Sequence, residues 1–286
     1  MNSCAEATTE DLRIRLHGDA SLPTLVYLPG LHGDWTLVKS FRLAVAGRVR
    51  FVEFTYPRTL TWSLDDYANA VDEALLAHGI THGWVLAESF SSQVAWPLLA
   101  SSVAAVCDRR TNEGEWRRSQ SAATNAHFTA EGLILAGAFV KHPVNWAVRL
   151  AERFAGGISL TWLTRLLFFY ARFARFRHRH APETLASIQE FIARRTELDK
   201  QAAKHRLTLV AHADFRAIAS QATLPVFQLS GFWDPVGPWF LVLPWLRRHC
   251  PGYRGSRIIG QADHNVLGTA PRESAEQVLD WMGVAE

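Results

Sequence analysis

The sequence has few cysteines, and they show no spacing typical of a metal site or a redox motif. Cys4, Cys107 and Cys250 are odd in number and far apart. Free thiols in a reducing compartment are the plainest interpretation, because secreted proteins usually carry paired cysteines. Residues 1–17 contain acidic side chains and no apolar segment, so we expect no signal peptide. These absences predict a cytoplasmic protein.

Long hydrophobic runs and blocks of one charge are also missing. The longest aromatic-rich run, residues 158–170, is interrupted by Arg165 and is shorter than the roughly 20 residues that span a bilayer. Charged residues make up 20% of the chain and the net charge is only +3. No basic block is long enough to indicate nucleic-acid binding. We therefore expect no transmembrane segment and no nucleic-acid partner.

The chain does contain enough apolar sequence for a large core. At 286 residues and 48% hydrophobic content, it fits one large domain, or one domain with an insertion. Eleven tryptophans and sixteen phenylalanines are many for this length. They predict a large apolar core and are compatible with an apolar cavity. No internal repeat is evident.

Short apolar runs alternate with helical patterns. The predicted strands cover residues 12–16, 24–28, 49–54, 83–88, 132–139, 225–231 and 257–260. Helices are predicted over residues 63–78, with Ser63 as N-cap, and over 271–281, with Pro271 in the first turn. A further helix after residue 88 contains Pro97, which should kink or interrupt it. This alternation predicts an α/β fold with a mostly parallel sheet covered by helices on both faces.

One long segment departs from this alternation. Residues 140–220 have an almost entirely helical pattern, which predicts a cap or lid inserted between two parts of a core, 1–139 and 221–286. On a helical wheel, Trp162, Phe169 and Phe173 share one face, and arginines occupy the adjacent face. We expect the arginines to face solvent. The aromatic face either packs on the core or lines an apolar substrate pocket, and a contact with an anionic interface is a further alternative.

The stretch from Gly83 to Ala95 predicts a strand, a sharp turn and a helix, with Ser89 in the turn. A nucleophile elbow has this layout, and its G-x-S-x-G pattern places a serine at the end of a strand. Here Ala87 and Ser91 occupy the two glycine positions, so the motif is degenerate. A serine at the end of an apolar run is, moreover, more often only a helix cap.

Two later loops carry the partners that a serine nucleophile needs. Its base and the acid that orients the base follow it in the order acid, then histidine, on loops after successive strands. Asp234 follows the strand 225–231, and His264 follows the strand 257–260. Each residue alone is more often an ordinary loop residue, but their order and positions together favour a triad. Asp263 is the nearest competitor for the acid, although a neighbour of His264 is poorly placed to orient that ring.

Hydrolysis through a serine also requires donors for the oxyanion. The backbone N–H of Phe90, directly after Ser89, is the first candidate, and that of Leu31 is the second. Gly30 and Gly33 would allow the loop of Leu31 to approach a substrate closely. We interpret His32 as a packing residue of that loop. Trp233 joins Trp162, Phe169 and Phe173 as a candidate for lining the substrate pocket.

These segments together resemble the α/β-hydrolase fold superfamily over nearly the whole chain. The resemblance is carried by residues 28–33, the elbow 87–91, and residues 231–235 and 262–264. It implies a Ser89–His264–Asp234 triad, hydrolysis through an acyl-enzyme, no cofactor and no metal, and a cap between the sixth and seventh strands of the superfamily's own count, which corresponds here to the segment between the strands 132–139 and 225–231. A serine at the nucleophile position argues against the haloalkane dehalogenase and epoxide hydrolase branches.

The function predicted from these residues is that of a carboxylesterase-like serine hydrolase acting on an ester of a small or medium apolar acyl group. The same triad would serve thioester cleavage, acyl transfer or carbon–carbon hydrolysis, since a fold does not fix its substrate. The altered elbow leaves open a ligand-binding protein without turnover. The partner that the sequence implies is a small apolar ester-type substrate, and the oligomeric state stays open.

Overall fold

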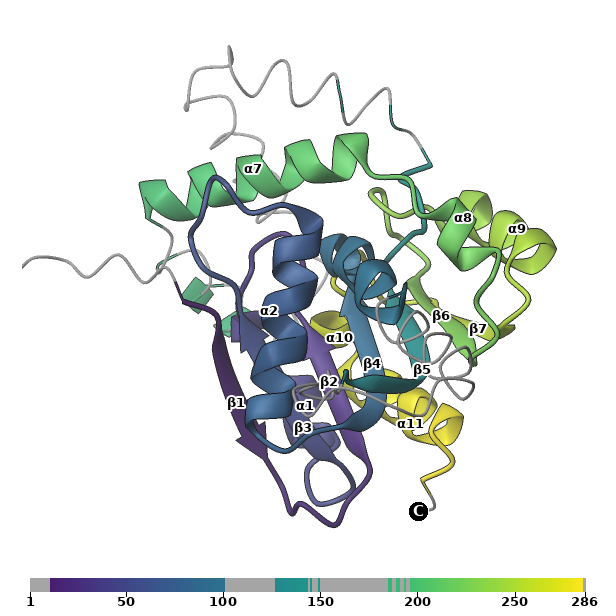
Figure 1. Ribbon diagram of the computed structural model, residues 1–286. Coiled ribbons are helices and arrows are strands. Elements are labelled where there is room, and N and C mark those ends of the chain that lie inside the picture. Colours follow the sequence, from purple (N-terminus) through teal and green to yellow (C-terminus); the bar gives the residue numbers. More distant parts are fainter. Residues whose placement is uncertain are drawn as a thin grey trace, which may run out of the picture.

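Figure 1 shows a computed structural model of the chain, which describes residues 11–100, 127–143 and 196–284 and a few isolated positions between 144 and 195. The described residues form one seven-stranded sheet in the order β1-β3-β2-β4-β5-β6-β7. The strands are β1 (Arg13–His17), β2 (Thr24–Leu28), β3 (Arg50–Thr55), β4 (His82–Glu88), β5 (Thr129–Ala136), β6 (Val226–Gly231) and β7 (Tyr253–Ile259). Only β1, at the edge, pairs antiparallel. The predicted mostly parallel sheet is confirmed.

Helices connect these strands. They are α1 (Lys39–Ala44), α2 (Leu64–Ala77), α7 (Glu197–His212), α8 (Arg216–Ala219), α9 (Trp239–His249), α10 (Val266–Thr269) and α11 (Pro271–Trp281). Residues 92–100 are also helical. Ser63 caps α2 in a reciprocal capping box with Asp66, as its sequence predicts. Pro271 occupies the first turn of α11, where its missing N–H costs no hydrogen bond.

Each face of the sheet carries its own apolar core. Successive side chains of a strand point to opposite faces, so Val26 and Leu28 of β2 pack in one cluster and Leu25 and Tyr27 in the other. The first cluster includes residues of α2, α7 and α9, and the second includes residues of α1, α10 and α11. Figure 1 shows α2 in front of the sheet and α11 behind it. The central strands are therefore covered on both faces.

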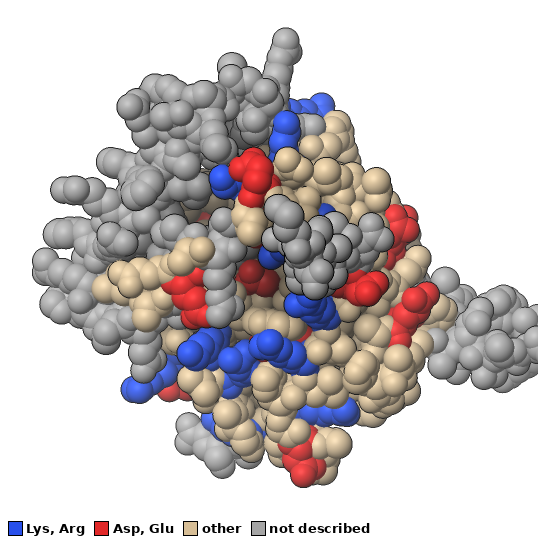
Figure 2. Space-filling model, turned by 90° about the vertical axis from the view of Figure 1, so that its left-hand side faces the viewer, with Lys and Arg blue, Asp and Glu red and all other residues tan. Residues whose placement is uncertain are grey.

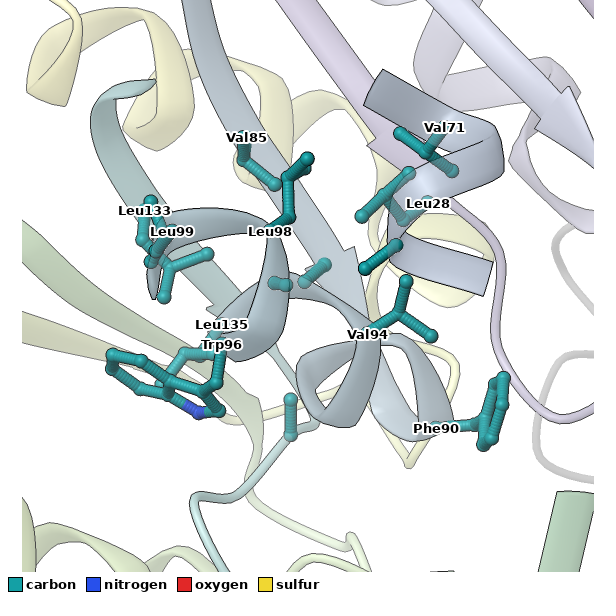
Figure 3. Packing of buried hydrophobic residues seen from close by; sticks show 14 of the residues in the cluster. Leu28, Val71, Val85, Phe90, Val94, Trp96, Leu98, Leu99, Leu133 and Leu135 are labelled. Atoms are coloured by element: carbon teal, nitrogen blue, oxygen red, sulfur yellow. The ribbon is translucent and has the colours of Figure 1, made fainter. Parts of the chain in front are cut away.

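The helix over residues 92–100 anchors the turn that precedes it. Figure 3 shows Val94 directed toward Leu28 and Leu98 beside Val85, all within one buried cluster. Trp96 is fully buried in the same cluster. The helix continues through Pro97, so the expected interruption does not occur. We attribute this to burial, because the packing of nearly every residue in this helix outweighs the one hydrogen bond that proline removes.

The predicted cap falls largely outside the described residues, and so do its aromatic face with Trp162, Phe169 and Phe173. Its last part is described. Thr196 caps α7 in a second capping box, and α7 buries Ala202, Val210 and Ala211. In Figure 1, α7 crosses the end of α2. The domain boundaries at residues 140 and 220 stay a prediction.

Several charged side chains form ion pairs, and one of the carboxylates, that of Glu53, is buried. Figure 2 shows one face of the molecule, on which Lys and Arg side chains occur among Asp and Glu side chains. Arg42 lies 2.7 Å from Glu53, and Arg58 lies 2.7 Å from Asp199.

None of the described helices is both long enough and apolar enough to cross a bilayer. Cys250 is a buried free thiol, whereas Cys4 and Cys107 lie outside the described residues, so the cytoplasmic location stays a prediction.

Candidate active site

Ser89 lies in a strained turn at the carboxyl end of the central strand β4. The chain passes from β4 into a short 3-10 turn, η2 (Ser89–Ser91), and then into the helix over residues 92–100. Ser89 has φ +48°, and no other non-glycine residue in the described ranges has a positive φ. Such a conformation costs about 1–3 kcal/mol and persists only where the surrounding structure enforces it. A nucleophile elbow has this strained strand–turn–helix geometry.

The two residues that replace the elbow glycines are accommodated differently. Ala87 is fully buried within the core cluster. The Ser91 hydroxyl donates to the carbonyl oxygen of Pro29 and lies 2.7 Å from the Tyr56 hydroxyl. Ser91 therefore ties the elbow to the loop after β2, a bond that glycine could not make.

Asp234 and His264 meet Ser89 at this edge of the sheet. The Nδ1 atom of His264 lies 2.9 and 3.0 Å from the two Asp234 carboxylate oxygens, and its Nε2 atom lies 2.8 Å from Ser89 Oγ. A carboxylate can only accept, so Nδ1 carries the proton and Nε2 is left to accept from the Ser89 hydroxyl. The structure thus brings together the three residues that the sequence predicts as a triad.

Asp234 is held as an ionised carboxylate. It is only 5% exposed, and its Oδ1 accepts from the backbone N–H groups of Val236 and Gly237, each at 2.8 Å. Burial alone would raise the pKa of Asp234, but His264 and these N–H groups hold it below its ordinary value. Asp263 contacts other groups, since its Oδ1 accepts from the N–H of Asn265 at 3.0 Å. The geometry favours Asp234 over Asp263 as the orienting acid.

Opposing effects act on His264. Burial alone would lower the pKa of the ring, but the charge and hydrogen bond of Asp234 raise it above its ordinary value, with smaller contributions from Glu88 and Asp263. The side chain is 22% exposed, so it remains accessible from the solvent side. A base with a raised pKa binds the serine proton more firmly during attack.

The two predicted oxyanion donors belong to the elbow and to the loop after β2, which the hydrogen bond from Ser91 to Pro29 joins. The N–H of Phe90 lies in the first turn after Ser89, where no preceding helical turn supplies an acceptor. Leu31 belongs to the loop after β2, which we call the oxyanion loop (residues 29–33). The N–H of Gly33 donates to the carbonyl of Gly30 at 2.9 Å, which closes this loop into a tight turn. Gly33 has φ +78°, a conformation that favours glycine.

Sequence reasoning missed the buried pair of Glu88 and Tyr27. Glu88, the residue before Ser89, is 4% exposed and accepts from the Tyr27 hydroxyl and from the N–H of Gly30, the latter at 3.3 Å. Burial and Glu88 raise the pKa of Tyr27 well above its ordinary value. His32 is near the same carboxylate, and its Nε2 atom lies 4.0 Å from Glu88 Oε2. The sequence did contain a signal for Glu88, because an acidic residue at the end of an apolar strand is unusual.

Of the predicted pocket-lining residues, only Trp233 is described. Its side chain is 57% exposed and meets Phe232 edge to face, with ring centroids 5.4 Å apart. Both residues directly precede Asp234. In the described part of the chain, no group of three His, Cys, Asp or Glu side chains is arranged to hold a metal ion.

Known structures resemble this one over almost the whole chain. A hydrolase from Pseudomonas aeruginosa PA01 aligns with a TM-score of 0.72 at 16% identity, covering 95% of this chain and 94% of that one. An enol-lactonase from Burkholderia xenovorans LB400 gives 0.67 at 15% identity, with 95% and 96% covered. A thermophilic esterase from Thermogutta terrifontis gives 0.67 at 16% identity, with 95% and 93% covered.

The chain has the α/β-hydrolase fold. No family model and no curated protein matches its sequence. At these identities the similarity establishes the fold, whereas the chemistry must be argued from the side chains. In this α/β-hydrolase fold, the loops after β4, β6 and β7 carry Ser89, Asp234 and His264.

Gly137, directly after β5, makes room for the acid–histidine pair. It has φ +56°, and a Cβ at this position would lie 2.7 Å from the His264 carbonyl oxygen and 3.3 Å from Asp234 Oδ2. We predict that Gly137→Ala lowers kcat/KM for an ester by about 10- to 100-fold, because it displaces the imidazole from Ser89. Gly79→Ala is the matched control, since Gly79 has φ +69° as well, but a Cβ there would meet open space. Equal activity of both variants would show that the pair tolerates displacement.

The pH dependence of hydrolysis provides a second prediction. If His264 is the base, it must be neutral, and its pKa is raised above the ordinary histidine value of about 6.5. Activity should therefore fall on acidification with a midpoint above about 6.5 in a plot of kcat/KM against pH. A midpoint clearly below this value would mean that the carboxylates do not stabilise the protonated ring.

Proposed function

We propose that this protein is a serine hydrolase that cleaves an ester of a small or medium apolar acyl group. The observation that carries the proposal is the 2.8 Å contact between His264 Nε2 and the hydroxyl of Ser89, a residue held at φ +48°. Strain of this kind concentrates at functional sites, and an ordinary helix-capping serine would not need it. Similarity in fold to hydrolases and esterases supports the same reaction class.

The first half-reaction forms an acyl-enzyme. His264 Nε2 takes the proton of Ser89 as its oxygen attacks the ester carbonyl, and the imidazolium is stabilised by Asp234. The N–H groups of Leu31 and Phe90 donate to the developing oxyanion. His264 then gives its proton to the alcohol oxygen, the bond from carbonyl carbon to that oxygen breaks, and the alcohol leaves.

The second half-reaction releases the acid. A water molecule gives a proton to His264 and attacks the acyl carbon, forming a second tetrahedral intermediate at the same donors. Collapse of this intermediate returns the proton to Ser89 and frees the carboxylic acid. His264 thus carries each proton, and the two half-reactions need no cofactor.

The preference for an apolar ester rests on the surroundings of Asp234. Phe232 and Trp233 are 49% and 57% exposed, although aromatic side chains of this size are usually buried. They directly precede Asp234 in the sequence, on the loop after β6. Aromatic rings beside a reaction centre favour apolar groups of a substrate. A panel of esters, thioesters and diketones, followed by product analysis, would distinguish ester cleavage from other reactions of the same triad.

The nucleophile is tested by substitution and by covalent labelling. Ser89→Ala should reduce hydrolysis of a p-nitrophenyl ester by several orders of magnitude while the protein stays folded, because the attacking oxygen is lost. A fluorophosphonate probe should label the wild-type protein on the peptide that contains Ser89 and leave the variant unlabelled, as mass spectrometry can verify. Full activity of the variant would refute the proposal. Slow or absent labelling of the wild type would favour a binding protein.

The acid is tested with a matched pair of variants. Asp234→Asn should lower kcat by about 10⁴-fold, because the amide no longer holds the imidazole in its productive tautomer. Asp263→Asn should retain most activity, since the amide oxygen can still accept from Asn265. The measurement is kcat for the same ester, with circular dichroism as the check on folding. The reverse order of effects would transfer the acid role to Asp263.

A further inference from the structure

The oxyanion loop is hydrogen-bonded at nearly every peptide group around Leu31. The N–H of Gly30 donates to Glu88 at 3.3 Å, and the carbonyl of Gly30 accepts from Gly33. The carbonyl of Leu31 accepts from Arg206 Nη1 at 3.1 Å. The N–H of Leu31 donates to no acceptor among the residues that the structure describes. The surrounding bonds fix the peptide plane of this N–H and leave the donor itself available.

Arg206 reaches this loop from α7, which lies on the far side of residues 144–195 in the sequence and against the Ser89–Ser91 turn in space. Arg206 is only 2% exposed. Besides Leu31, the guanidinium donates to the carbonyl of Pro57 at 2.9 Å and to the Tyr67 hydroxyl at 3.4 Å. Among the described residues, no carboxylate forms an ion pair with it.

This arrangement is unusual for a buried cation. Taking a guanidinium out of water is costly unless it is fully hydrogen-bonded, and most buried arginines face a carboxylate. Arg206 instead faces carbonyl dipoles and a hydroxyl. Gly33 lies directly against it, since a Cβ at Gly33 would collide with Nη1. The side chain and the loop therefore fit one another closely.

We infer that Arg206 is a positioning residue: it holds the carbonyl of Leu31, in the peptide group after the Leu31 N–H, and so keeps this N–H aimed at the oxyanion before substrate binds. The inference rests on the proposed hydrolase function. Arg206 acts through Leu31 and need not touch the substrate. Its loss should affect the tetrahedral intermediate more than the bound ester, because an oxyanion donor contributes mainly once charge has developed on the oxygen.

Arg206→Lys and Arg206→Ala test this role against His205→Ala. His205 is the neighbouring residue on α7 and contacts the Trp62 carbonyl at 2.8 Å, so its loss weakens the docking of α7 without touching the oxyanion loop. We expect both Arg206 variants to lower kcat by about 10- to 100-fold with KM little changed, since misplacing a reacting group by about 1 Å can cost this much. His205→Ala should keep the wild-type kcat, even where its melting temperature falls.

Two readouts distinguish positioning from simple structural support. The Ki of a trifluoromethyl ketone, whose adduct with Ser89 carries an oxyanion, should rise in the Arg206 variants by the same factor as kcat/KM falls. Guanidinium ion at a concentration well below denaturing levels should restore part of the activity of Arg206→Ala but not change that of His205→Ala.

The inference and the proposed function fail in different ways. If the wild-type protein neither hydrolyses esters nor reacts with the fluorophosphonate, the proposed function is wrong. If the wild type is active and the Arg206 variants keep its kcat and Ki, only the positioning role is wrong. Failure of Arg206→Lys to fold would also overturn it, because the side chain would then serve the core as a whole.

Discussion

The hydrogen-bonded chain from Asp234 through His264 to Ser89 is the constraint on which the rest of the site depends. Its three residues span 175 positions between Ser89 and His264, and they meet because parallel strands present their carboxyl ends at one edge of a sheet. The contact requires close approach, which Gly137 permits, and an ionised acid, which the N–H groups of the Asp234 loop maintain. Burial of both sheet faces supplies the rigidity that keeps Ser89 in its strained conformation.

The altered elbow is compensated within the structure. Glycine is expected on either side of such a serine because the turn is crowded, yet Ala87 fits the core and Ser91 forms a hydrogen bond to Pro29. Ser91 and Glu88 contact the carbonyl and the N–H of the Pro29–Gly30 peptide group, and Arg206 contacts the carbonyl of Leu31 in the same oxyanion loop. The loop is therefore fixed from the elbow and from α7 together, which joins the predicted nucleophile to the predicted oxyanion donor as one unit.

Much of this arrangement could be predicted from the sequence. Apolar runs located the strands, Ser63 marked the start of α2, and the order of Ser89, Asp234 and His264, each directly after a predicted strand, brought the site together. The contacts of Tyr27, Ser91 and Arg206 could not be predicted, because their partners lie 61, 62 and 175 residues away and no spacing rule links them. The interruption expected at Pro97 does not occur, because proline weakens a helix only locally, whereas burial stabilises this one as a whole.

The most direct test is a crystal structure of the protein after reaction with a phosphonate ester, which leaves a tetrahedral adduct that mimics the reaction intermediate. The adduct should be bonded to Ser89 Oγ, with one oxygen accepting from the N–H groups of both Leu31 and Phe90, and with His264 still between Ser89 and Asp234. A phosphorus atom on another residue, or an adduct oxygen that turns away from Leu31, would contradict the assembled site.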